Sequence, residues 1–172
     1  MKMTSPFYNY TLTTFIRGLD TLHCLLRKGE EHAKENNITL DELLNARIVE
    51  DMQPLAFQIV TATNNVGKAL GRAAFIDPPP QYPPDETYSE LYTRLQRYLV
   101  QLKDVDPVDI ASREGMSFTA PIGGDTFQYT LEEYSVRFSI PNFYFHLVTA
   151  YVILRSKGVN IGKLDYLAQF TA

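Results

Sequence analysis

The residues best placed to do chemistry are Asn142 and His146, four positions apart in a long apolar segment running from about 134 to 154. On a helix, this spacing stacks both side chains on one face. An amide and an imidazole inside an apolar helix need partners, because a buried polar group without a hydrogen bond costs free energy. The pair therefore either lines a pocket or forms a polar pair in a core, and the sequence leaves both readings open.

If the site is catalytic, His146 is the acid/base or the one strong metal ligand. Asn142 would then orient His146 or bind substrate, and Asp51, from an earlier helix, would be its polar partner. Tyr144 and Tyr151 have apolar rings with polar tips and could line an apolar pocket on the same helix. For either tyrosine alone, a place in the core is the favoured interpretation.

The residues give little support for a metal site. A catalytic zinc or iron site usually takes three protein ligands from His, Asp or Glu. The chain has three histidines, and the 142–146 spacing supplies only one strong ligand. A hydrogen-bonded core histidine is therefore favoured over a metal ligand for His146, and the cofactor stays undetermined.

Other function classes lack support. The formal net charge is −4 with no long basic run, which argues against nucleic-acid binding. The first residues lack the apolar core of a signal peptide, and the longest nearly uncharged apolar run, 143–154, is too short to span a bilayer. We expect a cytoplasmic protein that does not bind membranes. The single cysteine, Cys24, excludes an intrachain disulfide.

Apolar periodicity predicts a four-helix bundle spanning 1–172 as a single domain. Thr-x-x-Glu capping boxes begin the third and last helices, and Pro141 must kink or split the last one. Alternating residues around Gly123-Gly124-Asp125 predict one small β-hairpin. The proline-rich segment 77–84 is expected to be a stiff connector across the bundle end. The expected helices cover about 11–36, 52–73, 87–103 and 130–157.

Several motifs together resemble a small uncharacterised family from bacteria and fungi, itself similar to the DinB/YfiT-like superfamily of proposed metalloenzymes. The resemblance covers nearly the whole chain. It implies a DinB-like four-helix bundle that forms a homodimer through its helices. The motifs are Phe15-Ile16-Arg17-Gly18-Leu19, Ala46-Arg47-x-x-x-Asp51-Met52-x-Pro54-Leu55, Pro141-Asn142-Phe143-Tyr144-Phe145-His146, Thr149-Ala150-Tyr151-x-Ile153-Leu154-Arg155 and Gly158-Val159-x-x-Gly162-Lys163-x-Asp165-Tyr166-Leu167.

DinB-like proteins use three histidines to bind a divalent metal, two of them spaced His-x-x-x-His on the last long helix. The matching positions here are Asn142 and His146, so Asp51 or Gln58 would have to replace a missing ligand and the metal site is degenerate. We therefore carry two hypotheses. In the first, a homodimeric enzyme or binder acts on a small apolar molecule in a pocket within the bundle, lined by Tyr144, Tyr151 and Gln58. In the second, the protein is a non-catalytic dimeric scaffold or binding protein.

Overall fold

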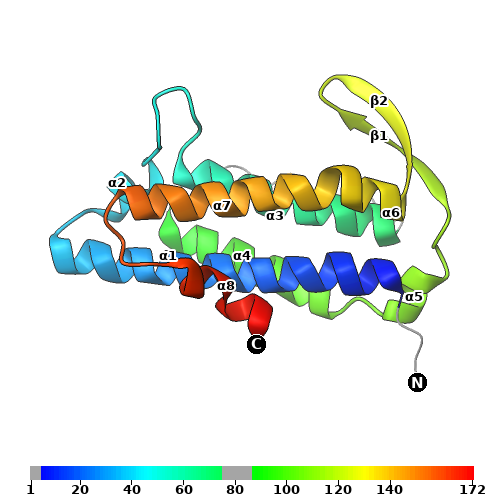
Figure 1. Cartoon of the computed structure of the whole chain (residues 1–172), viewed down its shortest axis with the longest axis horizontal. Helices are drawn as coiled ribbons and strands as arrows, with labels where there is room; N and C mark the ends of the chain where they lie inside the picture. The colour runs from blue at the N-terminus through cyan, green and yellow to red at the C-terminus, as the bar shows by residue number, and fades with distance from the viewer. Residues whose placement is uncertain (1–4, 75–86) are drawn as a thin grey trace.

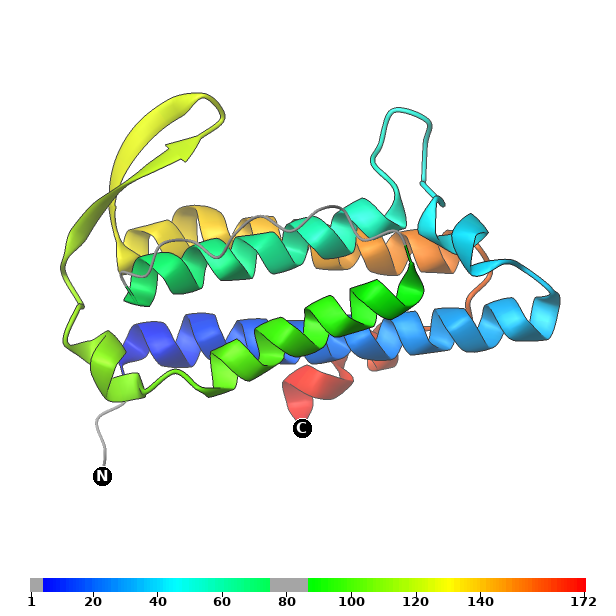
Figure 2. The same ribbon diagram turned by 180° about the vertical axis from the view of Figure 1, so that it is seen from behind.

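The computed structural model describes residues 5–74 and 87–172 and has the predicted architecture, a helical bundle with one projecting hairpin (Figures 1 and 2). The long helices form two layers, with α3 and α7 in one and α1 and α4 in the other. The predicted connector 77–84 lies outside the described residues. The helical elements are η1 (Tyr8–Leu12), α1 (Thr13–Asn36), α2 (Leu40–Leu44), α3 (Leu55–Ala74), α4 (Tyr88–Lys103), α5 (Pro107–Ala111), α6 (Leu131–Tyr134), η2 (Ser135–Ser139), α7 (Ile140–Ser156) and α8 (Lys163–Thr171).

The core follows the predicted apolar stripes. α3 and α7 make the most extensive contact between helices, and α1 packs against α4, α7 and α8. Gly18 lets α1 approach α7 closely, because a Cβ atom at this position would lie 2.2 Å from Phe143 Cε1. The neighbouring ring of Phe15 packs against Phe143 with ring centroids 5.0 Å apart. The stripe of the first helix is buried at Leu12, Phe15, Leu19, Leu22 and Leu26.

The helix starts fit the predicted caps, with one exception. Thr87 and Thr130 form the two expected capping boxes. The second long helix begins at Leu55, three residues later than predicted. Asp51, expected on this helix, lies exposed in the preceding loop. The Leu55 N–H is instead bonded to the carbonyl of Ala46, 2.9 Å away, which satisfies a donor at the helix start without a side-chain cap.

Pro141 is accommodated by a widened turn. The π-helical turn η2 precedes α7, and the Ile140 N–H bonds to the Ser135 carbonyl, five residues back. A proline ring cannot donate the usual helical hydrogen bond and would collide with the preceding turn. A π-turn is a recognised way for a helix to absorb such an interruption. The predicted break at Pro141 thus takes the form of a π-turn between α6 and α7.

The hairpin consists of β1 (Ser117–Ile122) and β2 (Asp125–Thr130), paired antiparallel. It projects from the same side of the molecule as the α3–α7 layer, and the loop between α2 and α3 projects from the opposite end (Figures 1 and 2). Within the described residues, no helix is both long enough and apolar enough to cross a membrane.

Candidate functional site

His146 meets Gln58 inside the contact between α7 and α3. The imidazole Nδ1 lies 2.8 Å from Gln58 Oε1, and the two residues are 88 positions apart in the chain. His146 is 8% exposed and Gln58 is 2% exposed. Both residues stand on the edge of their helix that faces the other helix, so the two helices together create the pair.

The hydrogen bonds fix the state of the imidazole. Gln58 Nε2 donates to the backbone carbonyl of Gln53 at 2.9 Å, which turns the amide oxygen toward His146. A carbonyl oxygen only accepts, so Nδ1 of His146 must carry the proton and Nε2 keeps its lone pair. Among the buried side-chain nitrogens and oxygens of the described residues, only the Tyr88 hydroxyl lacks a partner. No described residue forms a hydrogen bond with His146 Nε2, and this nitrogen is not among the fully buried atoms without a partner, so it keeps a small contact with solvent.

The surroundings favour a neutral imidazole. Burial lowers the pKa of His146, because the desolvated imidazolium is disfavoured. Two aromatic rings flank the imidazole: Phe145 at 5.2 Å and Phe57 at 6.2 Å between ring centroids. The site therefore offers one uncharged nitrogen lone pair between two phenyl rings. Such a group can accept one hydrogen bond or supply one metal ligand.

The other predicted site residues do not join this pair. Asn142 is half-buried, one turn before His146, and Asp51 is exposed in the loop before α3; neither is hydrogen-bonded to His146. Tyr144 packs against Phe170 of α8, and Tyr151 packs against Tyr166 of the same helix. Of the predicted pocket residues, the structure brings Gln58 to His146 and places the two tyrosines against α8.

The described residues do not fit a DinB-like metal centre. They contain no group of three His, Cys, Asp or Glu side chains able to hold a metal ion. The remaining histidines lie elsewhere: His23 packs its ring against Tyr92 on α4, and His32 Nε2 lies 3.2 Å from the Lys157 carbonyl. A metal at His146 would have a single strong protein ligand, fewer than a catalytic site usually has.

A second buried polar pair, not anticipated from the sequence, links α3 to the π-turn. Asn65 Nδ2 donates to the Ser139 carbonyl at 2.7 Å, and the Ser139 hydroxyl donates to Asn65 Oδ1 at 3.4 Å. The adjacent asparagines Asn64 and Asn65, which are poor helix formers inside a predicted helix, were the one available signal. Arg94, 1% exposed, was also missed; its guanidinium donates to Asn64 Oδ1 at 3.2 Å.

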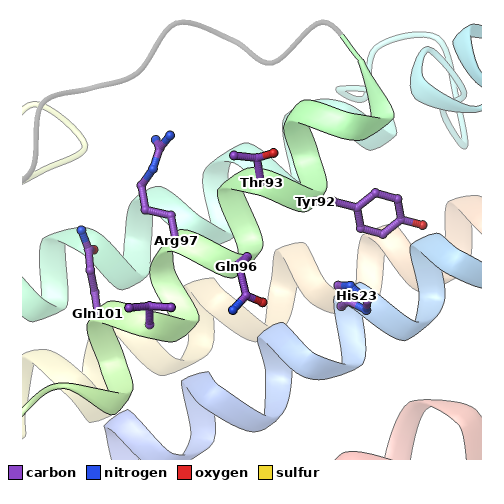
Figure 3. Close-up of a pocket in the computed structure, with 7 residues that line it drawn as sticks. His23, Tyr92, Thr93, Gln96, Arg97 and Gln101 are labelled. Carbon is purple, nitrogen blue, oxygen red and sulfur yellow. The ribbon is translucent and has the colours of Figure 1, made fainter.

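Two surface hollows formed by described residues lie away from His146. One, of about 660 Å³, lies along α4 beside His23 of α1 (Figure 3). In Figure 3, Arg97 and Gln101 extend away from His23, so the polar groups do not converge as they do in a typical ligand site. The other, of about 630 Å³, lies beside α2 and is lined by Ile38, Glu42, Leu43, Asn45, Ala46, Arg47 and Lys157.

The outer side of α3 and α7 carries exposed apolar side chains. Phe145, Val148 and Val152 recur at spacings of three and four, which places them on one stripe of α7. Their exposed fractions are 59, 42 and 37%. Phe57 of α3, 43% exposed, lies beside them across His146. We call these four residues the α3–α7 face; its phenyl rings adjoin the buried His146–Gln58 pair.

Comparison with known proteins identifies a matching family model and a similar solved structure. A family model described as "Domain of unknown function (DUF1993)" matches residues 7–167. The chain is also similar to the crystal structure of a DinB family member protein from Shewanella denitrificans, with 31% sequence identity and a TM-score of 0.84. The alignment covers 93% of this chain and 90% of that one. No curated protein matches the sequence. The DinB-like fold predicted from the sequence is confirmed.

Proposed function

The chain belongs to the DUF1993 family, and we propose that it is a non-catalytic homodimeric scaffold or binding protein of the cytoplasm. The observation that carries this proposal is that the His146 side chain is buried and hydrogen-bonded. Its Nδ1 is held by Gln58, and the imidazole is almost entirely covered. A catalytic base must reach a substrate proton, and a metal ligand needs companions. His146, the histidine of the degenerate site, thus forms with Gln58 a polar pair in the core between α3 and α7.

The competing hypothesis requires open volume at His146. An enzyme or binder for a small apolar molecule would hold it in a concave, largely enclosed pocket within the bundle. The two hollows described above are lined by other residues. His146 is only 8% exposed, and the two rings nearest its imidazole, Phe57 and Phe145, are 43 and 59% exposed at the outer surface. That placement suits a contact with a partner surface better than an internal substrate.

The α3–α7 face supports self-association. Covering Phe57, Phe145, Val148 and Val152 removes apolar surface from water, which stabilises a complex by roughly 25 cal/mol per Å². A two-fold dimer uses the same patch on both copies, and an uncharged apolar patch can pack against itself without opposing like charges. In such a dimer the phenyl rings over His146 become part of the interface. The polar pair then holds α3 and α7 in register beneath it.

The test compares two matched surface substitutions by size-exclusion chromatography with light scattering at micromolar concentration. Wild type should have twice the monomer mass of 19.6 kDa. Phe145→Asp should be monomeric, because a carboxylate in the centre of an apolar contact is costly. Leu164→Asp, which changes an 83% exposed residue of α8, should remain dimeric. A monomeric wild type, or a Phe145→Asp protein that stays dimeric, would contradict the proposed interface.

A second measurement separates scaffold from enzyme. Elemental analysis of purified wild type and His146→Ala tests whether His146 holds a metal. One equivalent of zinc, iron or nickel in the wild type that is lost in His146→Ala would restore the metalloenzyme hypothesis. This outcome is independent of whether the dimer forms.

A further inference from the structure

The turn of the β-hairpin determines which of its cross-strand residue pairs are hydrogen-bonded. Gly123 and Gly124 form its two-residue turn with φ values of +63° and +95°, as a type I′ turn requires. Ile122 faces Asp125 across the turn. Residues that flank such a turn exchange both backbone hydrogen bonds, and bonded pairs then alternate with non-bonded pairs along the ladder. The next bonded pair is therefore Ala120 with Phe127.

The non-bonded pairs direct their backbone groups to the free edges of the hairpin. These pairs include Pro121 with Thr126 and Thr119 with Gln128. On β1, Pro121 has no N–H to offer at the free edge, which blocks pairing there. On β2, both Thr126 and Gln128 present an N–H and a C=O outward, and both residues are exposed. Within the described residues the sheet has only these two strands, so the outward edge of β2 has no neighbouring strand.

A row of aromatic rings ends at this open edge. Phe118 contacts Tyr134, Tyr134 contacts Tyr129, and Tyr129 contacts Phe127, with centroid separations of 5.5, 5.8 and 6.1 Å. The first three rings are buried or half-buried, whereas Phe127 is 43% exposed. The edge segment Thr126–Gln128 carries no charged side chain, although charge is a common protection of natural strand edges. The end of the row is therefore an uncovered apolar group beside unpaired backbone.

We infer that β2 pairs antiparallel with β2 of a second copy of this chain, about a two-fold axis at Phe127. In this register Thr126 faces Gln128 of the other copy, so each outward N–H and C=O gains a partner. The two Phe127 rings face each other in a non-bonded pair, where cross-strand side chains come closest. Asp125 faces Tyr129 of the other copy, so no like charges meet. The product is a four-stranded sheet that continues the aromatic row into the second molecule.

This surface goes beyond the proposed α3–α7 dimer, because it uses different residues. A contact of a few residues on one strand is far smaller than a stable interface, so it should be weaker than the helical one. We expect it to join dimers into assemblies of four copies or more as the protein concentration rises. The hairpin is thus a second, concentration-dependent self-association site.

Disulfide trapping tests the register. In a Cys24→Ser background, Phe127→Cys places two thiols opposite each other across the axis, within reach of a disulfide. Thr119→Cys, at an exposed position on β1, is the matched control. Under mild oxidation, Phe127→Cys should form a linked dimer at least about tenfold faster than Thr119→Cys, because pairing raises the local thiol concentration. Equal rates, or no linkage at Phe127→Cys, would overturn the proposal; a β2 edge that accepts strands only from other proteins would give that result.

Two substitutions, Gln128→Pro in β2 and Phe145→Asp in α7, distinguish pairing at the hairpin from the proposed helical dimer. Gln128→Pro removes an outward N–H of β2 without touching the β1–β2 ladder, and Thr119→Pro does the same on β1. Only Gln128→Pro should abolish assembly beyond the dimer at high concentration. After oxidation and under native conditions, the Phe127→Cys protein should form assemblies of four copies or more, whereas Phe127→Cys with Phe145→Asp should form only the disulfide-linked pair. If Phe145→Asp prevents the disulfide itself, the hairpin is not an independent site and the inference fails.

Discussion

Substitution of His146 by Ala tests whether the polar pair is part of the core. The side chains of His146 and Gln58 are both buried, so removing the imidazole leaves the amide oxygen of Gln58 without its partner. An unpaired buried acceptor costs about 1–3 kcal/mol. The vacated ring volume adds roughly 1 kcal/mol, because the exposed Phe57 and Phe145 can partly collapse into it. We expect the free energy of unfolding to fall by about 2–4 kcal/mol.

The assay is a urea melt of a double-mutant cycle. His146→Ala and Gln58→Ala are measured singly and together, with the fold checked by circular dichroism. The two losses should not add, because the second substitution removes a group that the first has already left unpaired; a coupling of about 1–2 kcal/mol is expected. His146→Leu combined with Gln58→Leu should recover much of the loss. A loss below about 1 kcal/mol for His146→Ala, or two losses that simply add, would refute the core-pair reasoning.

The same variants give a pH dependence with a defined sign. Burial holds the pKa of folded His146 below its ordinary value of 6.5. Between the folded and unfolded pKa values, the unfolded chain binds a proton that the folded chain does not, so stability rises with pH. The contribution of a neutral His146 is complete above about pH 6.5 and is lost as the pH falls toward the folded pKa. The stability difference between wild type and His146→Ala should therefore shrink on acidification; a difference that grows would contradict a desolvated neutral histidine.

Three further outcomes are expected. Gly18→Ala should destabilise the protein by about 1–3 kcal/mol in urea melts, because its Cβ would overlap Phe143, and a smaller side chain at Phe143 (Phe143→Leu) should recover part of that loss. Thr130→Ala should lower the free energy of unfolding by about 1 kcal/mol, because it removes the side chain that caps the Glu133 N–H. The control, Thr93→Ala at an exposed position inside a helix, should be neutral or stabilising. Equal effects of the two substitutions would contradict the capping argument. Protein purified without added metal should contain less than one equivalent of divalent metal by elemental analysis, and a full equivalent bound at His146 would overturn this expectation.

Local patterns were sufficient wherever the governing physics is local. The capping boxes at Thr87 and Thr130 were predicted and are present, because each depends on backbone groups within a few residues. The Gly123–Gly124 turn was predicted for the same reason, and it fixes the pairing of β1 with β2. The start of α3 was missed by three residues, because its first N–H is satisfied by the distant carbonyl of Ala46 and not by a neighbouring side chain.

The candidate site depended on contacts that the sequence does not encode locally. The sequence singled out His146 as a polar residue in an apolar helix, and it named Gln58 as a potential pocket residue or a substitute metal ligand. The structure joins them, since the two residues lie on facing edges of α7 and α3. It also turns Tyr144 and Tyr151 toward α8, which separates them from the pair.

The sequence by itself determined that the chain is a helical bundle with one hairpin and that His146 must have a partner. Helix periodicity and turn chemistry are properties of short segments, so they can be read without knowing what packs where. Only the tertiary structure decided which amide meets His146, which apolar residues remain outside on the α3–α7 face, and which hairpin edge stays open. These outcomes depend on how helices far apart in the sequence dock, and docking is set by the summed shape of many side chains, not by any one motif.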